Sequence, residues 1–513
     1  METSEYFTWK DWQKNDWDVD VNLQAHKGDD EYDVIIIGAG LAGLTCGARL
    51  SKRGFKILLV EQHHQVGGVY TSFKRKEFLF NSGAFVITGL WDNGPIDFFL
   101  RDLGVDKEDY FVKSSFKYNF GAMEIDFSSG VQDLIEQIAE KFPYERANIN
   151  AFFEDARKAM DERFSDSDKY GIPLSPELIV KVYGEERMIR HLEECPHHYD
   201  WMKKSFRQKL DEHFESDEIK DLINFIFNYL AIDPAITPAD VALRAYTWFR
   251  EGSHFPLGGA QKLSDFVKDY LEKNGGKVLL KTKVDKILTD NQSVLGVVCG
   301  DKAYKAPVIV SNSNVKTTFL DLIDSDVLET NYLEYVKSLE MAASGFIIFL
   351  GLDKEFSGYP TVLALETEDG FSWLVFNSNS DPYTAPEGKT SLTIFTTPIQ
   401  YSDFPDRGTE KYQRKKDELR DSILKKAEKT IPGLNEHITV MDAGTPKTFE
   451  RYLMMPEGSV EGIDGSVRTD KPCFKTPIKG LYLAGQTTHP GSGIELAIMS
   501  GLICANDILD WKS

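Results

Sequence analysis

A strand, a glycine-rich turn, a helix and a second strand follow one another in residues 33–61, which read DVIIIGAGLAGLTCGARLSKRGFKILLVE. The apolar runs predict strands over Asp33–Ile37 and Lys56–Val60, and the segment between them predicts a helix that extends to about Arg53. A strand–helix–strand unit of this kind places its two strands parallel in one sheet. The segment therefore predicts an α/β fold built on a parallel sheet.

Three glycines in the turn suggest what this unit binds. Gly38, Gly40 and Gly43 form the pattern GxGxxG directly after the first strand. The first glycine permits a tight turn, the second lets the backbone approach a pyrophosphate, and the third lets the helix pack on the strand. Glu61 ends the second strand, where a carboxylate can accept hydrogen bonds from a ribose. We predict a bound adenine dinucleotide; the alternative is a glycine-rich turn without a ligand.

The composition narrows the class of function. Of 513 residues, 59 are Lys or Arg and 81 are Asp or Glu, so the formal net charge is −22. A chain this acidic repels phosphate backbones, which argues against nucleic-acid binding and against docking on anionic lipid by net charge. The N-terminus lacks the apolar run of a signal peptide, and no run reaches the roughly 20 apolar residues of a membrane span. We expect a cytoplasmic protein that is soluble or attached peripherally to a membrane.

Further motifs follow the first in order along the chain. A second glycine pair completes E-x5-GG over Glu61–Gly68, the runs FPLGGAQKLSDFVKDYLEKNGG, VDKI and VIVSNSN lie within residues 255–314, and KGLYLAGQTTHPGSGI occupies residues 479–494. From residue 33 to residue 510 these motifs resemble the carotenoid desaturase, carotenoid isomerase and retinol saturase family of FAD-dependent oxidoreductases. They are specific to that family, within the amine-oxidase-type FAD proteins, but not to one activity in it.

The resemblance implies a domain organisation. A discontinuous, Rossmann-like FAD-binding domain would accompany a mixed β-sheet substrate domain and a helical cap. The implied boundaries are 1–32 for an N-terminal arm, 33–105, 255–320 and 475–513 for the FAD-binding domain, 106–130 and 321–474 for the substrate domain, and 131–254 for the cap. The arm holds Trp9, Trp12 and Trp17, and it either packs on the body or contacts a membrane interface or a partner.

Periodicity adds several expected elements. Charged and apolar residues alternate at helical spacing in Ile149–Arg163 and Tyr199–Glu215, and Leu222–Ile232 is the most apolar helix candidate. A charged helix is expected at about 409–430. Near the C-terminus we expect a strand over Gly480–Ala484 and a helix over Ile494–Leu509.

The resemblance also implies which residues line FAD. Val284 would present backbone to the adenine, and Gly485–Ile494 would meet the riboflavin end, where a helix N-terminus can stabilise negative charge on the reduced flavin. The complete implied set is Gly38, Gly40, Leu41, Ala42, Gly43, Glu61, Gln62, Gly67, Gly68, Val69, Tyr70, Val284, Gly485, Gly493, Ile494 and Glu495.

Two positions depart from the family pattern. Val69 stands where many members have Arg after the glycine pair, and Glu495 stands where many have Pro. Glu495 and His489 are the catalytic candidates, as acids near the flavin edge. Their alternatives are a first-turn carboxylate stabilised by the helix dipole and a hydrogen-bonded turn residue, respectively. Tyr70 and Arg451 are weaker candidates.

A metal site needs separate consideration. His191, Cys195, His197 and His198 crowd the run HLEECPHH, but no second half-site stands nearby. The favoured interpretation is a polar helix end broken at Pro196, and no metal is expected.

The implied activity is desaturation, saturation or isomerisation of C=C bonds in an apolar polyene, such as a carotenoid, a retinoid or a polyketide polyene. The alternatives are a flavin amine-oxidase-type enzyme, a reductive polyene cyclase and a non-catalytic flavin-binding protein. No second GxGxxG follows a strand, so only transient contact with NAD(P)H is left open. The expected partners are an apolar small molecule and, peripherally, a membrane; the electron partner stays open.

Overall fold

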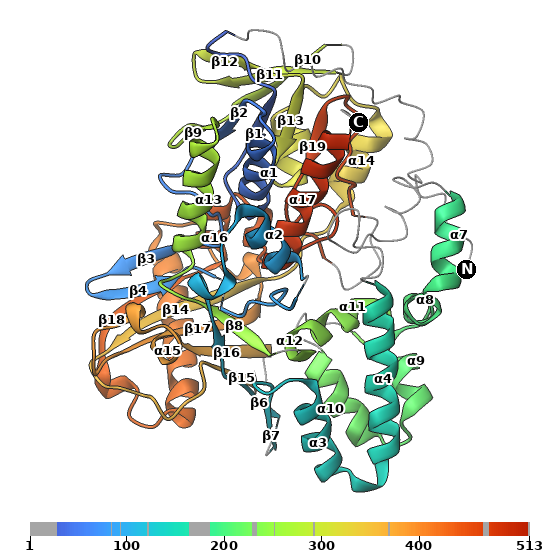
Figure 1. Cartoon of the computed structure of the whole chain (residues 1–513). Helices are drawn as coiled ribbons and strands as arrows, with labels where there is room; N and C mark the ends of the chain where they lie inside the picture. Colours follow the sequence, from blue (N-terminus) through green and yellow to red (C-terminus); the bar gives the residue numbers. More distant parts are fainter. Residues whose placement is uncertain are drawn as a thin grey trace. The chain divides into compact units, whose positions relative to one another are not determined.

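The computed structural model describes residues 28–83, 85–92, 94–120, 123–163, 185–227, 233–250, 252–290, 293–367, 370–464 and 471–510 (Figure 1). The chain forms two compact units. Unit 1 comprises Met1–Thr71, Leu263–Glu340 and Asp470–Ser513, and unit 2 comprises Ser72–Lys262 and Met341–Thr469. Residues 1–27 of the predicted arm, which include its three tryptophans, lie outside the described residues.

A five-stranded parallel sheet forms the centre of unit 1. Its strand order is β19-β13-β1-β2-β9, and each neighbouring pair runs parallel. The strands are β1 (Val34–Ile37), β2 (Ile57–Val60), β9 (Lys277–Leu279), β13 (Val308–Ser311) and β19 (Leu481–Leu483). Four of these are continuous apolar or small-residue runs that are buried throughout, as expected of parallel strands covered on both faces. The predicted parallel sheet is confirmed.

Two helices from opposite ends of the chain lie side by side in unit 1 (Figure 1). They are α1 (Leu41–Lys52) and α17 (Ile494–Asp510). A Cβ on Gly501 would lie 2.3 Å from the Ala42 carbonyl oxygen, so only glycine permits this approach. The Arg49 side chain then donates to the Asn506 side chain at 2.6 Å. The N- and C-terminal parts of the chain therefore build one body.

The remaining elements of unit 1 surround this sheet. A three-stranded antiparallel sheet contains β10 (Lys286–Asp290), β11 (Ser293–Cys299) and β12 (Lys302–Lys305). The helices are α13 (Gln261–Lys273), of which residues from Leu263 belong to unit 1, and α14 (Thr330–Ser338).

A seven-stranded sheet with the order β18-β14-β17-β16-β15-β6-β7 organises unit 2. Its β15–β6 pair is parallel and its other pairs are antiparallel, so the predicted mixed sheet is confirmed. The strands are β6 (Phe116–Phe120), β7 (Met123–Asp126), β14 (Ser344–Leu352), β15 (Val362–Thr367), β16 (Gly370–Phe376), β17 (Thr390–Ile399) and β18 (Ile438–Gly444).

The two faces of this sheet bury different side chains. Successive residues of a strand point to opposite faces. One face carries Phe346, Ile348 and Leu350 and packs against Ile423 and Leu424 of the predicted charged helix, α15 (Glu410–Thr430). The other face is rich in aromatic rings and packs against the helical part of unit 2. The rings on its strands include Phe116, Tyr118, Phe349, Phe371, Trp373 and Phe395.

Helices dominate the described residues between 131 and 250. They are α3 (Val131–Lys141), α4 (Arg146–Arg163), α7 (Glu185–Glu194), α8 (Pro196–Lys203), α9 (Phe206–His213), α10 (Asp217–Phe227), α11 (Ala239–Ala242) and α12 (Tyr246–Arg250). The segment Tyr199–Glu215, which we expected to be helical throughout, divides at Ser205, whose side chain forms a capping box with Gln208 and starts a new helix. The end of the expected helix Leu222–Ile232, residues 228–232, lies outside the described residues. None of the described helices is both long and apolar enough to cross a bilayer.

Residues 72–105 differ from the sequence-based assignment. They contain β3 (Ser72–Arg75), β4 (Phe78–Asn81) and α2 (Pro95–Leu103), and they belong to unit 2 together with β5 (Phe111–Ser114), β8 (Ser253–Pro256) and α16 (Pro446–Leu453). We had placed them in the FAD-binding domain. Phe78, Phe80 and Phe85 instead join the aromatic core of unit 2, because apolar alternation does not specify which core a hairpin enters.

Candidate functional site

The first glycine-rich loop lies at the carboxyl end of β1 and begins α1. Gly38 has φ +93°, which favours glycine. A Cβ on Gly40 would lie 2.7 Å from Asn312 Oδ1, and one on Gly43 would lie 2.3 Å from the Gly38 carbonyl oxygen. Backbone conformation or lack of space therefore favours glycine at each of the three positions. Gly43 lets α1 pack against its own strand, as predicted for this motif.

The loop ends at a helix N-terminus whose N-cap residue has no side chain to cap it. Gly40 is the N-cap of α1 and supplies no side-chain acceptor, and the first turn of α1 has no acidic residue. The amides of Leu41 and Ala42 stand in that first turn, where an α-helix offers no backbone acceptor. This end of α1 therefore has the donors and the partial positive charge that favour an anion.

The second glycine pair lies directly against the first loop. Gly67 donates its backbone N–H to the Ala39 carbonyl at 2.7 Å, and a Cβ on Gly68 would lie 3.2 Å from the Gly40 Cα. Both glycines have positive φ, +115° and +62°. The glycines of the two loops thus bring bare backbone together in one place, which we call the cradle (residues 38–43 and 67–68). This is the geometry that a pyrophosphate requires.

Glu61 lies beside the same loop. Its Oε2 accepts from the Ala39 N–H at 2.8 Å and its Oε1 accepts from the His63 N–H at 2.7 Å. Each carboxylate oxygen retains a further lone pair for a ribose hydroxyl. Gln62, the next predicted residue, is exposed.

The segment before β10 runs along Glu61. Thr282 donates its backbone N–H to the Glu61 carbonyl at 2.9 Å, and Lys281 donates to the His63 carbonyl at 2.9 Å. Val284 follows and is buried, at 6% exposure. The structure therefore places the predicted adenine segment next to the predicted ribose carboxylate.

Asn312 connects three parts of the site and was absent from our predicted site residues. Its Oδ1 accepts from the Gly43 N–H at 3.1 Å, its Nδ2 donates to the Ala484 carbonyl at 3.1 Å, and its backbone N–H donates to the Ile37 carbonyl at 2.8 Å. The available signal was a polar residue directly after the buried strand β13, because ligands of open α/β sheets bind beyond the carboxyl ends of their strands.

The C-terminal motif joins the cradle through this asparagine. A Cβ on Gly485 would lie 2.5 Å from Asn312 Nδ2, and the Gly485 N–H donates to Ser500 Oγ at 3.0 Å. Gly493, with φ +118°, precedes α17, which begins at Ile494. Glu495 is half-buried in the first turn of α17. This is the position expected of a carboxylate that is stabilised by the helix dipole.

His489 is half-buried before α17. Its backbone N–H donates to the Pro472 carbonyl at 3.1 Å and its carbonyl accepts from Ser500 Oγ at 3.2 Å. These bonds hold the turn in place, so its backbone role is structural.

Tyr70 and Val69 follow the second glycine pair. The Val69 side chain is half-buried. The Tyr70 side chain is buried, and its hydroxyl has no hydrogen-bond partner in the part of the chain that the structure describes. Burial raises the pKa of this hydroxyl well above its usual value. A buried donor of this kind is ordinarily satisfied by a partner that binds in the working protein.

The other candidates lie in unit 2. Arg451 lines a surface pocket described below. In the run HLEECPHH, α7 ends at Glu194 and α8 begins at Pro196, so the predicted helix break is confirmed. His197 Nδ1 lies 3.0 Å from Asp155 Oδ1 and is thus engaged in a side-chain pair. No cluster of metal ligands occurs among the described residues.

Unit 1 therefore has the parts that a dinucleotide needs. The two glycine loops form a cradle that a single Cβ would fill, the α1 N-terminus offers donors to the pyrophosphate, and Glu61 offers a carboxylate. Residues 41–509 match the family of flavin containing amine oxidoreductases.

The chain belongs to this family.

Relatives match nearly the whole chain. A chloroplastic prolycopene isomerase from Daucus carota is 26% identical over 93% of this chain and 80% of its own length. A 4,4'-diaponeurosporene oxygenase from Staphylococcus haemolyticus is 24% identical over 93% and 96%. An all-trans-retinol 13,14-reductase from Danio rerio is 24% identical over 94% and 86%. The resemblance to the carotenoid and retinoid oxidoreductases is confirmed.

Solved structures share the fold. An oxidoreductase from Methanosarcina mazei aligns with a TM-score of 0.62 at 20% identity, over 92% of this chain and 99% of that one. A putrescine oxidase bound to putrescine aligns with a TM-score of 0.63 at 14% identity, over 94% and 99%. The predicted fold class is confirmed, and the protein is a flavin-dependent oxidoreductase.

Proposed function

We propose that this protein is an FAD-dependent oxidoreductase that desaturates, saturates or isomerises C=C bonds of an apolar polyene. One observation carries the proposal. Three relatives that each match at least 93% of the chain have names that refer to the isomerisation, oxygenation or reduction of carotenoids or a retinoid. The reaction types differ among them, whereas the class of substrate does not.

FAD is the form of flavin that the geometry of unit 1 supports. The cradle formed by Gly40 and Gly68 suits a pyrophosphate, which FAD has and FMN lacks. Glu61 would hold the adenosine ribose, and the backbone near Val284 would meet the adenine. When bound, the flavin supplies hydride acceptance or donation.

An apolar chain finds suitable partners on the aromatic face of unit 2. The rings of Trp248 and Trp373 meet edge to face at 5.4 Å, and Phe116 lies 5.9 Å and 5.7 Å from them, respectively. Trp248, Trp373 and Phe371 are only half-buried. Their exposed surface can pack along a conjugated chain without requiring polar groups from it.

Glu495 is the proposed proton donor for saturation. Its place in the first turn of α17 favours the carboxylate, so the acid form must be stabilised when the apolar substrate excludes water. Glu495→Gln should abolish uptake of solvent deuterium into a saturated product, with the flavin content of the variant measured alongside. Equal deuterium uptake by the variant would remove Glu495 from the reaction.

The proposal is tested by product analysis. The purified protein is loaded with FAD, oxidised or reduced, and incubated anaerobically with carotenoids, retinoids and polyketide polyenes. We expect a mass change of two hydrogens or a new isomer with at least one of them. Gly40→Ala should lose this activity together with the flavin, because its Cβ would lie 2.7 Å from Asn312 Oδ1 and would displace the loop, whereas Gly358→Ala, which meets open space, should keep both.

Amine oxidation is the second candidate, since the family takes its name from amine oxidoreductases. Release of hydrogen peroxide on aerobic incubation with amines, without conversion of any polyene, would favour it over our proposal.

A further inference from the structure

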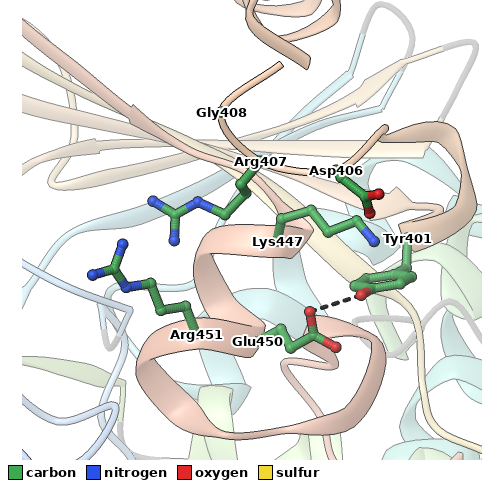
Figure 2. Close-up of a pocket in the computed structure, with 7 residues that line it drawn as sticks. All are labelled: Tyr401, Asp406, Arg407, Gly408, Lys447, Glu450 and Arg451. Atoms are coloured by element: carbon green, nitrogen blue, oxygen red, sulfur yellow. Dashed lines mark hydrogen bonds between the residues drawn. The ribbon is translucent and has the colours of Figure 1, made fainter. Parts of the chain in front are cut away.

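A surface pocket of about 580 Å³ lies in unit 2 (Figure 2). It is formed by the segment between β17 and α15 and by α16. Its lining residues are Tyr401, Asp406, Arg407, Gly408, Lys447, Glu450 and Arg451. Three of these side chains are cationic and two are anionic, in a protein whose formal net charge is −22.

In one half of the pocket the polar side chains contact one another. The Tyr401 hydroxyl donates to Glu450 Oε2 at 2.7 Å, and Lys447 Nζ lies 3.4 Å from the centre of the Tyr401 ring. Burial, followed by the opposing effects of Lys447 and Glu450, raises the pKa of Tyr401 and keeps its hydroxyl protonated as a donor. Lys447, Tyr401 and Glu450 therefore form a closed set that holds the first turns of α16 in place.

The other half presents two guanidinium groups. Figure 2 shows Arg407 and Arg451 on the same side of the pocket, turned away from the carboxylates of Asp406 and Glu450. Neither arginine forms an ion pair with a described residue, and both are exposed. Some other exposed arginines of unit 2 do have carboxylate partners, for example Arg75 with Asp442 at 2.9 Å and Arg146 with Glu136 at 2.7 Å.

The end of α16 beside Arg451 exposes apolar surface. Tyr452 is 58% exposed and Met454 is 42% exposed. A tyrosine ring suits the boundary between headgroups and acyl chains, and a methionine side chain suits the apolar layer below it. A pair of arginines flanked by such residues has the composition of a lipid-contacting surface.

We propose that Arg407 and Arg451 bind the phosphate of an anionic lipid headgroup and dock unit 2 on a membrane surface. A phosphate monoester offers three oxygens, enough for two-point contacts from both guanidinium groups, whereas a carboxylate offers two. The net charge of −22 repels an anionic bilayer at long range, so contact has to rely on a local site of this kind. The inference does not depend on which substrate the flavin site converts.

The test is cosedimentation of the FAD-loaded full chain with vesicles. Phosphatidylcholine vesicles containing phosphatidic acid are compared with pure phosphatidylcholine vesicles. The wild type should bind the former, and the double variant Arg407→Gln/Arg451→Gln should bind at least about tenfold more weakly, since each basic group near an anionic surface contributes about one kcal/mol. The control Arg414→Gln/Lys425→Gln removes the same charge from exposed positions on α15 and should bind as the wild type does.

Soluble ligand distinguishes the two sources of phosphate. Inorganic phosphate should compete with vesicle binding by the wild type. If inorganic phosphate binds the pocket but vesicles do not, the site serves a soluble phosphate and the membrane proposal is wrong. Equal vesicle binding by the double variant and its control, or no binding to either vesicle, would also overturn it.

Discussion

The parallel sheet of unit 1 and the seven-stranded sheet of unit 2 bury their strands in different ways. The strands of the parallel sheet have three or four residues, and the site lies in the loops that follow them. The strands of unit 2 have up to ten residues and divide their side chains between the aromatic face, which packs on the helical part of unit 2, and a face that packs on α15. Unit 1 thus presents backbone groups, and unit 2 presents side chains.

This difference predicts which substitutions affect flavin binding and which affect substrate preference or stability. Backbone cradles tolerate no added atom, so substitutions at the glycines of unit 1 should remove the flavin. Side-chain surfaces tolerate replacement, so substitutions in unit 2 should alter substrate preference or stability while the flavin stays bound.

Gly43→Ala should have the largest effect. Its Cβ would lie 2.3 Å from the Gly38 carbonyl, so α1 must move away from β1, at a cost of about 3 kcal/mol in the free energy of unfolding. We expect the ratio of flavin to protein to fall at least tenfold by absorbance, with Gly358→Ala as the control. Full flavin content in the Gly43→Ala variant would contradict the claim that the glycine loops of unit 1 tolerate no added atom.

Asp155→Asn should come next, with a loss of about 2 kcal/mol in stability and unchanged flavin content. Asp155 Oδ2 pairs with Lys209 Nζ at 2.7 Å, and Lys209 is 3% exposed. Burial acts to raise the pKa of Asp155, but hydrogen bonds from His213, Lys209 and His197 outweigh it and hold the pKa well below the ordinary value of 3.8.

The stability that Asp155 contributes depends on pH. A lowered pKa stabilises the folded state above pH 3.8, and this contribution is lost as the pH falls below that value. Urea unfolding should therefore show a difference between wild type and Asp155→Asn that is about 1 kcal/mol smaller at pH 3 than at pH 7. A difference that does not change with pH would contradict the assignment.

Trp373→Leu should raise the KM for a polyene about tenfold and leave the flavin content unchanged, because the smaller side chain loses aromatic contact area. Phe376→Leu is the matched control, since Phe376 lies on the same strand but on the opposite face, toward α15. Steady-state kinetics decide, and equal KM values for both variants would remove the aromatic face from substrate binding.

Asn312→Asp should have the smallest effect. The carboxylate keeps the acceptor for the Gly43 N–H but loses the donor to Ala484, which costs about 1 kcal/mol. Its negative charge beside the phosphate cradle should also weaken FAD binding several-fold, as measured by flavin fluorescence titration. FAD affinity equal to that of the wild type would contradict the placement of the pyrophosphate.

Local features of the molecule were predictable from sequence, and long-range ones were not. β1, β2 and the glycine loops follow from apolar runs and from backbone conformations that only glycine adopts readily. The position of Asn312 after a buried strand indicates a site residue, but the sequence does not identify its partner Gly43, which is 269 residues away. The same limit applies to Phe78 and Phe80, because their alternation predicts a buried face but not the core that it joins.

The central claim is that the cradle of unit 1 holds an FAD that acts on polyenes. The most direct measurement compares wild type and Gly40→Ala, each supplied with FAD and with a carotenoid, a retinoid and an amine in parallel. We predict that the wild type converts a polyene by two hydrogens or to a new isomer and releases no hydrogen peroxide with the amine. Gly40→Ala should leave the polyenes unchanged. Peroxide release with the amine and unchanged polyenes would contradict the account.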